Sequence, residues 1–134
     1  MMEDEHIATV RMLIDTAESL AQDPRTALAA GELVWGAVIH ASAVIAHRVN
    51  RRPRHPRHVR DVERLLMSAV TDDTARASIS RGLDITQKRL HNHFYTGQLN
   101  AVELARYIRT GIDFIGRLLQ IASQPQAAGG SPAI

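Results

Sequence analysis

The sequence contains no cysteine, and this absence removes two classes of small protein at once. A disulfide framework and every zinc site built on thiolates need cysteine, so neither applies here. The chain has 134 residues. A single domain of that length buries roughly two-thirds of the surface that it exposes when unfolded, so it has no need of such links to fold.

Long apolar runs are scarce as well. The longest candidate, residues 33–46, is interrupted by Gly36 and His40, whereas a membrane span needs about 20 mostly apolar residues. Residues 3–5 are all acidic, the opposite of the basic start of a secretion signal. We therefore expect no membrane segment, and we expect a cytoplasmic protein.

Lysine is almost missing, because Lys88 is the one lysine among 16 basic residues. A preference for arginine suits phosphate or carboxylate recognition, but a GC-rich genome gives the same preference through its codons. The formal net charge is only +2. A balance so close to neutral is not that of a dedicated nucleic-acid binder, and the genomic interpretation is favoured.

Apolar residues recur at three- and four-residue steps along most of the chain, which is typical of amphipathic helices. The helices are predicted over residues 4–22, 24–49, 58–70, 73–95 and from 100 to about 123. The second of them is apolar nearly all round until His47, so we expect it to be the central helix. With no strand-like alternation, the prediction is an all-α, up-and-down bundle of about five helices in one domain, residues 1–123, and a disordered tail, residues 124–134.

The predicted helix ends follow from local residue types. Asp23 is expected to cap the second helix with Pro24 at its first position, and Gly97 to end the fourth helix in a left-handed conformation. Asn100 and Glu103 form the capping-box pattern of the last helix. The buried stripe of the fourth helix is expected to be Ala75, Ile79, Leu83, Thr86, Leu90 and Phe94.

Two segments carry a family resemblance. Residues 30–42 read AGELVWGAVIHAS and are followed, after an arginine-rich loop, by His55 or His58; residues 89–95 read RLHNHFY. Together they resemble the paREP-type family of small archaeal and bacterial helical proteins, which is related to the HEPN (higher eukaryotes and prokaryotes nucleotide-binding) superfamily. The resemblance covers residues 26–122 and implies a HEPN-like bundle of four or five helices, often a homodimer.

The resemblance also implies a candidate catalytic site. Some HEPN branches are metal-independent ribonucleases with an Arg-x4–6-His motif, in which arginine holds the phosphate and histidine transfers protons. Here Arg89 and His93 stand at the matching place, supported by Asn92 and Tyr95, but their spacing is Arg-x3-His. Lys88 fills the four-residue gap instead, which puts the activity in doubt.

A plainer interpretation makes His91 and His93 packing or hydrogen-bonding residues near a helix end. As metal ligands they point about 200° apart on a helix, which does not suit one ion. His40 and His47 share a helix face, but two histidines are too few for a site. We therefore expect no metal and no cofactor.

The segment 48–60 holds the densest positive charge, and its candidate phosphate-binding residues are Arg51, Arg52, Arg54 and Arg57. No aromatic residue is interleaved to stack bases, which weakens the case for nucleic acid. The favoured alternative is a solvated loop whose arginines pair with Asp61, Glu63 and the acidic N-terminus.

The first hypothesis is therefore a non-enzymatic, HEPN-like module that works as a homodimer. It would bind a nucleotide, a nucleic acid such as RNA, or a protein partner, as in one half of a toxin–antitoxin-like system. The second hypothesis is an atypical HEPN ribonuclease that uses Arg89 and His93. The third is a purely structural subunit. The dimer is expected because a helix apolar nearly all round has more apolar surface than one small bundle readily covers, and Trp35 is expected in the core or the dimer interface.

Overall fold

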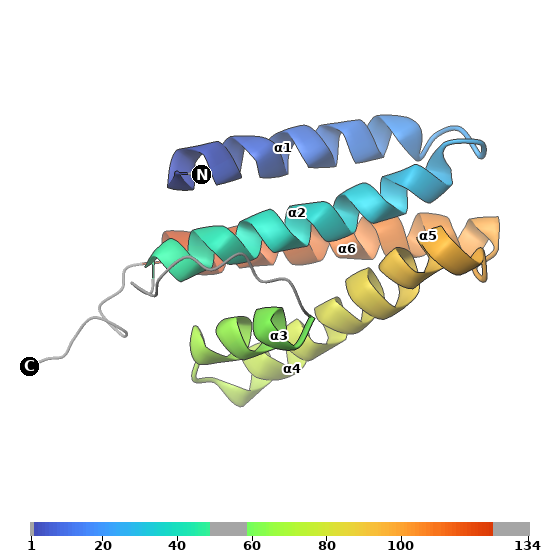
Figure 1. Ribbon diagram of the computed structural model, residues 1–134. Coiled ribbons are helices and arrows are strands. Elements are labelled where there is room, and N and C mark those ends of the chain that lie inside the picture. The colour runs from blue at the N-terminus through green and yellow to red at the C-terminus, as the bar shows by residue number, and fades with distance from the viewer. Residues whose placement is uncertain (1, 49–58, 125–134) are drawn as a thin grey trace, which may run out of the picture.

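The computed structural model describes residues 2–48 and 59–124, and all regular structure in these ranges is helical (Figure 1). No strand occurs among the described residues, so the predicted all-α fold is confirmed. The elements are α1 Glu3–Leu20, α2 Ala27–Arg48, α3 Val59–Ser68, α4 Asp73–Leu83, η1 Asp84–His91, α5 Asn92–Thr96 and α6 Ala101–Ser123. The predicted tail and the arginine-rich loop lie largely outside the described residues.

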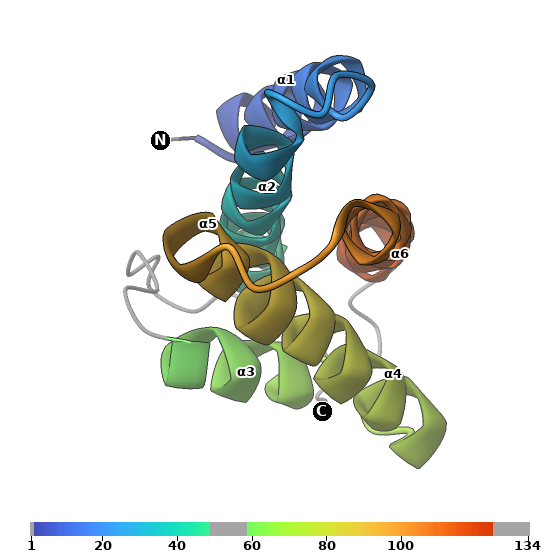
Figure 2. The same ribbon diagram turned by 90° about the vertical axis from the view of Figure 1, so that its right-hand side faces the viewer.

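Helix α2 is the centre of the domain, as the sequence predicts. Eleven of its 22 residues are buried, more than in any other described helix. Helix α1 packs on one side of α2, and α6 and η1 pack on the other (Figure 2). Helix α1 packs chiefly on α2, so its coupling to the rest of the bundle runs mainly through α2.

Helix α2 is also more apolar than the sequence analysis expected of any segment. An 18-residue window of α2 has a mean hydropathy of 1.6, so the helix is long and apolar enough to cross a membrane. However, 61% of that window is buried inside the domain. The neighbouring helices therefore account for its apolarity, as is usual for a core helix.

Helices α4, η1 and α5 form one continuous helical rod that crosses the bundle obliquely (Figure 2). This rod matches the predicted fourth helix, but its middle third is π-helical. The hydroxyl of Thr86 donates to the carbonyl of Gly82 at 2.9 Å, within the turn that leads into the π segment. Such turns hold more residues than an α turn and change which side chains face a neighbouring element.

Glycines allow α6 to pack closely on both the rod and α2. A Cβ atom on Gly82 would lie 2.2 Å from Cδ1 of Phe114, whose ring is fully buried. On the opposite helix, a Cβ atom on Gly111 would lie 2.7 Å from Cγ1 of Val34. The ring of Phe114 and the side chain of Val34 thus occupy the space that the side chain of any residue other than glycine would need at positions 82 and 111.

Four members of the predicted stripe, Ile79, Leu83, Thr86 and Leu90, are buried, but Phe94 is not. Phe94 is 36% exposed, and His93 takes the inner position instead. Nδ1 of His93 accepts the backbone N–H of Leu99 at 2.8 Å, where the chain turns back toward α6. This bond draws His93 inward and leaves Phe94, the next residue, facing outward.

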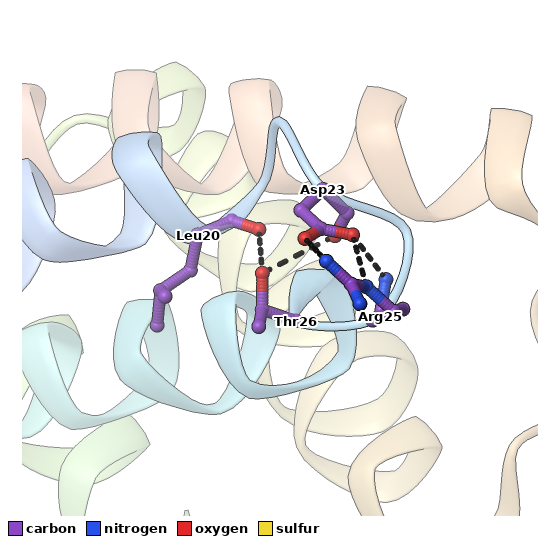
Figure 3. Close-up of polar contacts among 4 residues, drawn as sticks. All are labelled: Leu20, Asp23, Arg25 and Thr26. Atoms are coloured by element: carbon purple, nitrogen blue, oxygen red, sulfur yellow. Dashed lines mark hydrogen bonds and ion pairs between the residues drawn. The ribbon is translucent and has the colours of Figure 1, made fainter.

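The connection between α1 and α2 differs from the prediction. Helix α2 begins at Ala27, not at Pro24, and Asp23 caps a turn instead of the helix. The Asp23 carboxylate accepts the backbone N–H of Arg25 at 2.9 Å, while Thr26 donates its hydroxyl to the carbonyl of Leu20 at 2.7 Å (Figure 3). The Thr26 hydroxyl thus satisfies a carbonyl at the end of α1, and the Asp23 carboxylate satisfies an N–H group that precedes α2.

The end of α5 and the start of α6 confirm the predicted signals. Gly97 has φ 64°, the left-handed conformation that glycine adopts without strain. The backbone N–H of Glu103 donates to Oδ1 of Asn100 at 2.8 Å, and the N–H of Asn100 donates to Oε1 of Glu103 at 3.1 Å. This reciprocal pair is the predicted capping box.

The substitution Gly82→Ala should destabilise the fold by about 1–3 kcal/mol, because the new methyl group overlaps the buried ring of Phe114. The matched control is Gly116→Ala on α6, where nothing lies within 4 Å of the added Cβ. That control should stabilise the helix by about 0.5–1 kcal/mol. Urea denaturation measures both; equal effects would contradict the close packing of α4 on α6.

The pKa of Asp23 is expected to be lowered, first by the side-chain hydrogen bond from Arg25 and then by the backbone N–H of Arg25. A lowered pKa means that the turn is stabilised above the ordinary carboxyl pKa and loses this stabilisation as the pH falls through the folded-state value. Arg25→Ala should therefore raise the titration midpoint of Asp23 followed by NMR, and the exposed Arg64→Ala control should not. An unchanged midpoint in Arg25→Ala would contradict this turn structure.

Candidate functional site

The two segments that carry the family resemblance meet in space. Glu32 lies on α2 and His91 ends η1, and Nδ1 of His91 lies 2.7 Å from Oε1 of Glu32. The two side chains are 25% and 29% exposed, so the bond is largely protected from water. This contact spans 59 residues of sequence and joins α2 to the rod.

Aromatic rings surround the imidazole of His91. Its centroid lies 5.6 Å from that of Trp35 and 5.5 Å from that of Tyr95, which it meets edge-on. Tyr95 in turn meets the ring of Phe94 edge-on at 5.1 Å. Edge-to-face contacts at such distances are favourable. We call Glu32, Trp35, His91, Phe94 and Tyr95 the aromatic cluster.

Helical spacing explains how α2 contributes two members of the aromatic cluster and the rod contributes three. Glu32 and Trp35 are three residues apart on α2, and His91 and Tyr95 are four residues apart on the rod, so each pair shares a helix face. The rod turns toward α2 at this point, because Leu90 packs 3.3 Å from the position that a Cβ atom of Gly31 would occupy. The small residue in α2 therefore brings the two faces together.

The Glu32–His91 bond determines what the ring can do. A neutral imidazole that donates from Nδ1 to a carboxylate keeps its lone pair on Nε2, and its orientation is fixed. Among the described residues, no hydroxyl group is hydrogen-bonded to His91 that it could activate as a nucleophile. The arrangement therefore orients aromatic rings, of which Tyr95 is 71% exposed.

The predicted catalytic residues differ in exposure and, among the described residues, are not joined by side-chain hydrogen bonds. Arg89 and Asn92 are exposed, His93 is 5% exposed, and no hydrogen bond joins Arg89 to His93 in the described part of the chain. Tyr95 contacts His91 and Phe94 instead of His93. The nearby Lys88 pairs with Asp84 at 3.1 Å.

His93 is also in an unsuitable state for proton abstraction. Because Nδ1 accepts the N–H of Leu99, the neutral ring carries its proton on Nε2. A general base needs a free lone pair directed at its substrate, and here the only lone pair is already engaged. The interpretation of His91 and His93 as hydrogen-bonding residues near a helix end describes both contacts.

The candidate phosphate-binding residues Arg51, Arg52, Arg54 and Arg57 lie outside the described residues. At the edge of that segment, Nε of Arg48 lies 2.8 Å from Oε1 of Glu3. One arginine of the segment 48–60 thus pairs with the acidic N-terminus, as the alternative interpretation expects.

A second histidine cluster joins α1 to α2. Nδ1 of His6 lies 2.8 Å from Nδ1 of His40, and the rings of His6 and His47 are 5.9 Å apart. One imidazole of the first pair must donate and the other accept, so the contact requires that they do not both carry a proton at that nitrogen. Within the described ranges, no group of three or more His, Asp or Glu side chains is arranged to hold a metal ion.

Sequence reasoning missed the central role of Glu32. The residue was part of the resemblance motif, yet only the partner 59 residues away reveals its contact. The one signal in the sequence was that Glu32 is the single acidic residue of the otherwise mostly apolar segment 30–42. Comparison with known proteins finds no matching family model, no similar curated protein and no similar solved structure.

Replacing Glu32 should show how firmly the aromatic cluster is held. Glu32→Ala should destabilise the protein by about 1.5–3 kcal/mol, the range for a hydrogen bond to a charged group, and should shift the fluorescence of Trp35, the single tryptophan. The control Asp84→Ala removes the exposed pair with Lys88 and should cost less than about 0.5 kcal/mol. If both substitutions cost the same, the Glu32–His91 bond does not stabilise the fold.

Proposed function

We propose that this chain is a non-enzymatic, HEPN-like binding module that holds a protein partner, in the first place a second copy of itself, through the aromatic cluster. The observation that carries the proposal is the exposed ring of Tyr95, which is 71% exposed yet fixed by His91. The cysteine-free sequence is consistent with a cytoplasmic setting for such a module.

Exposed but ordered aromatic rings are the usual anchors of protein interfaces. Tyr and Trp bury much surface at a low cost in side-chain entropy, and they are enriched among the residues that dominate binding energy. Tyr95 and Phe94 offer such surface, and the Glu32–His91 bond holds it in place from behind. The ordering needed for binding is thus largely complete before a partner arrives.

The charge of the aromatic cluster favours protein over phosphate. Its ionic member is a carboxylate, Glu32, and the one lysine of the sequence, Lys88, already pairs with Asp84. Phosphate recognition would instead call for arginine or lysine directed at the ligand. Binding of RNA or of a nucleotide, if it occurs, belongs to the arginine-rich segment and not to this cluster.

The reason for expecting a dimer changes with the structure. The apolar surface of α2 is covered by α1, α6 and η1 of the same chain, so it does not require a second copy. The reason for proposing a homodimer is therefore the exposure of the rings of Tyr95 and Phe94. A partner from a toxin–antitoxin-like pair would use the same rings.

Sedimentation equilibrium tests this proposal with the purified protein. The wild type should form dimers at micromolar concentration, and Tyr95→Ala should weaken the association at least tenfold, about 1.4 kcal/mol. The control Val102→Ala removes an equally accessible apolar side chain, 78% exposed, outside the cluster and should leave the association unchanged.

Two results would contradict the proposal. A wild-type monomer, with no co-purifying protein that Tyr95→Ala loses, would remove the binding role of the aromatic cluster. RNA cleavage that survives a chelator and disappears in both Arg89→Ala and His93→Ala would instead establish the ribonuclease alternative.

A further inference from the structure

A pocket opens at the end of the bundle where α1 turns into α2 and α5 turns into α6. Its volume is about 280 Å³, and Figure 2 faces the end of the domain that contains both turns. The apolar side chains of Leu28, Leu99, Leu104 and Ile108 contribute to its wall, together with several alanines. None of its eleven lining residues is an acid, a lysine or an arginine.

One buried polar side chain lines this apolar pocket. His93 is only 5% exposed, and its Nδ1 accepts the N–H of Leu99, so Nε2 of the neutral ring carries the proton. In the described part of the chain, Nε2 of His93 has no hydrogen-bond partner. Among the described residues, only Nε2 of His47 is fully enclosed without a hydrogen-bond partner, so Nε2 of His93 retains some contact with solvent. Because His93 lines the pocket, this nitrogen can reach a molecule bound there.

A buried N–H donor without a protein acceptor is unfavourable by about 1–3 kcal/mol unless water or a ligand accepts its hydrogen bond. The pocket therefore presents a mainly apolar wall and one buried donor, His93, besides the exposed amide side chain of Gln22. Small-molecule sites typically combine apolar walls with a few polar groups of this kind. A charged ligand does not fit, since no described lining residue offers it an opposite charge.

We infer that this pocket binds a small, neutral, mainly apolar molecule whose one hydrogen-bond acceptor, such as a ketone or amide oxygen, accepts from Nε2 of His93. The volume corresponds to that of roughly nine water molecules in the liquid, so the ligand has about ten non-hydrogen atoms. This site is separate from the aromatic cluster, because His93 and His91 face different surroundings on the rod. It assigns His93 the role of a ligand-binding donor instead of a catalytic base.

Two probes of similar shape test the inference. Acetophenone carries a carbonyl oxygen, whereas isopropylbenzene has the same number of non-hydrogen atoms and no acceptor. In NMR titrations of the whole protein, acetophenone should bind saturably, shift the amide signals of Leu99 and Ala105, and shift Nε2–H of His93. Isopropylbenzene should bind at least fivefold more weakly, since it leaves that N–H without an acceptor.

A pair of alanine substitutions locates the site. Ala105 is exposed on α6 and lines the pocket, so Ala105→Leu should fill part of the pocket without disturbing the core and weaken acetophenone binding at least tenfold. Ala77 is exposed on α4 and does not line it, so Ala77→Leu should bind acetophenone as the wild type does.

Three outcomes would overturn the inference. They are a lack of saturable acetophenone binding, equal affinity for the two probes, and undiminished affinity in a folded Ala105→Leu variant. The dimerisation of Tyr95→Ala is measured independently, so failure of this inference and failure of the proposed binding function are distinguishable.

Discussion

The burial of α2 is the constraint on which the rest of the domain depends. An apolar helix of this length is stable in water only if its neighbours cover it on several sides, and here α1, α6 and η1 do so. Small residues let those neighbours approach closely. Gly31 admits Leu90 from the rod, and Gly111 of α6 admits Val34. The positions of Glu32 and Trp35 follow from that packing, because both lie on the part of α2 that the rod approaches.

Periodicity in the sequence was sufficient to predict the helices and their common core, because burial of one helix face leaves a direct imprint on residue spacing. Capping signals at Gly97 and Asn100 were equally local, and the structure confirms them. The turn after α1 was predicted wrongly, since Asp23 has two possible roles. It can cap a helix or close a turn, and the hydroxyl of Thr26 bonded to Leu20 favours the turn.

The candidate site was much harder to predict, because it is made of contacts between distant segments. Glu32 and His91 are far apart in sequence, and nothing local indicates that a carboxylate on one helix meets an imidazole on another. The choice between Phe94 and His93 as the inner residue depended on a bond to Leu99, beyond the end of the helix. Arg89 and His93 are four residues apart, which is the spacing of neighbours on one helix face. In the structure, however, His93 is buried and Arg89 is exposed, so the two side chains face different surroundings.

The same rod thus presents two different features on two faces. The aromatic cluster offers ordered, exposed rings to a partner, and His93 lines an apolar pocket at the end of the bundle. Both require the rod to be fixed against α2, which again makes the burial of α2 decisive.

Amide hydrogen exchange tests that central claim most directly, because it measures the opening free energy of each helix separately. The amides of residues 34–45 in α2 should exchange most slowly, together with those on the buried face of α6 and only through global unfolding, while α3 should exchange faster. Amides of α2 that exchange as fast as those of α3 would contradict this account of the domain.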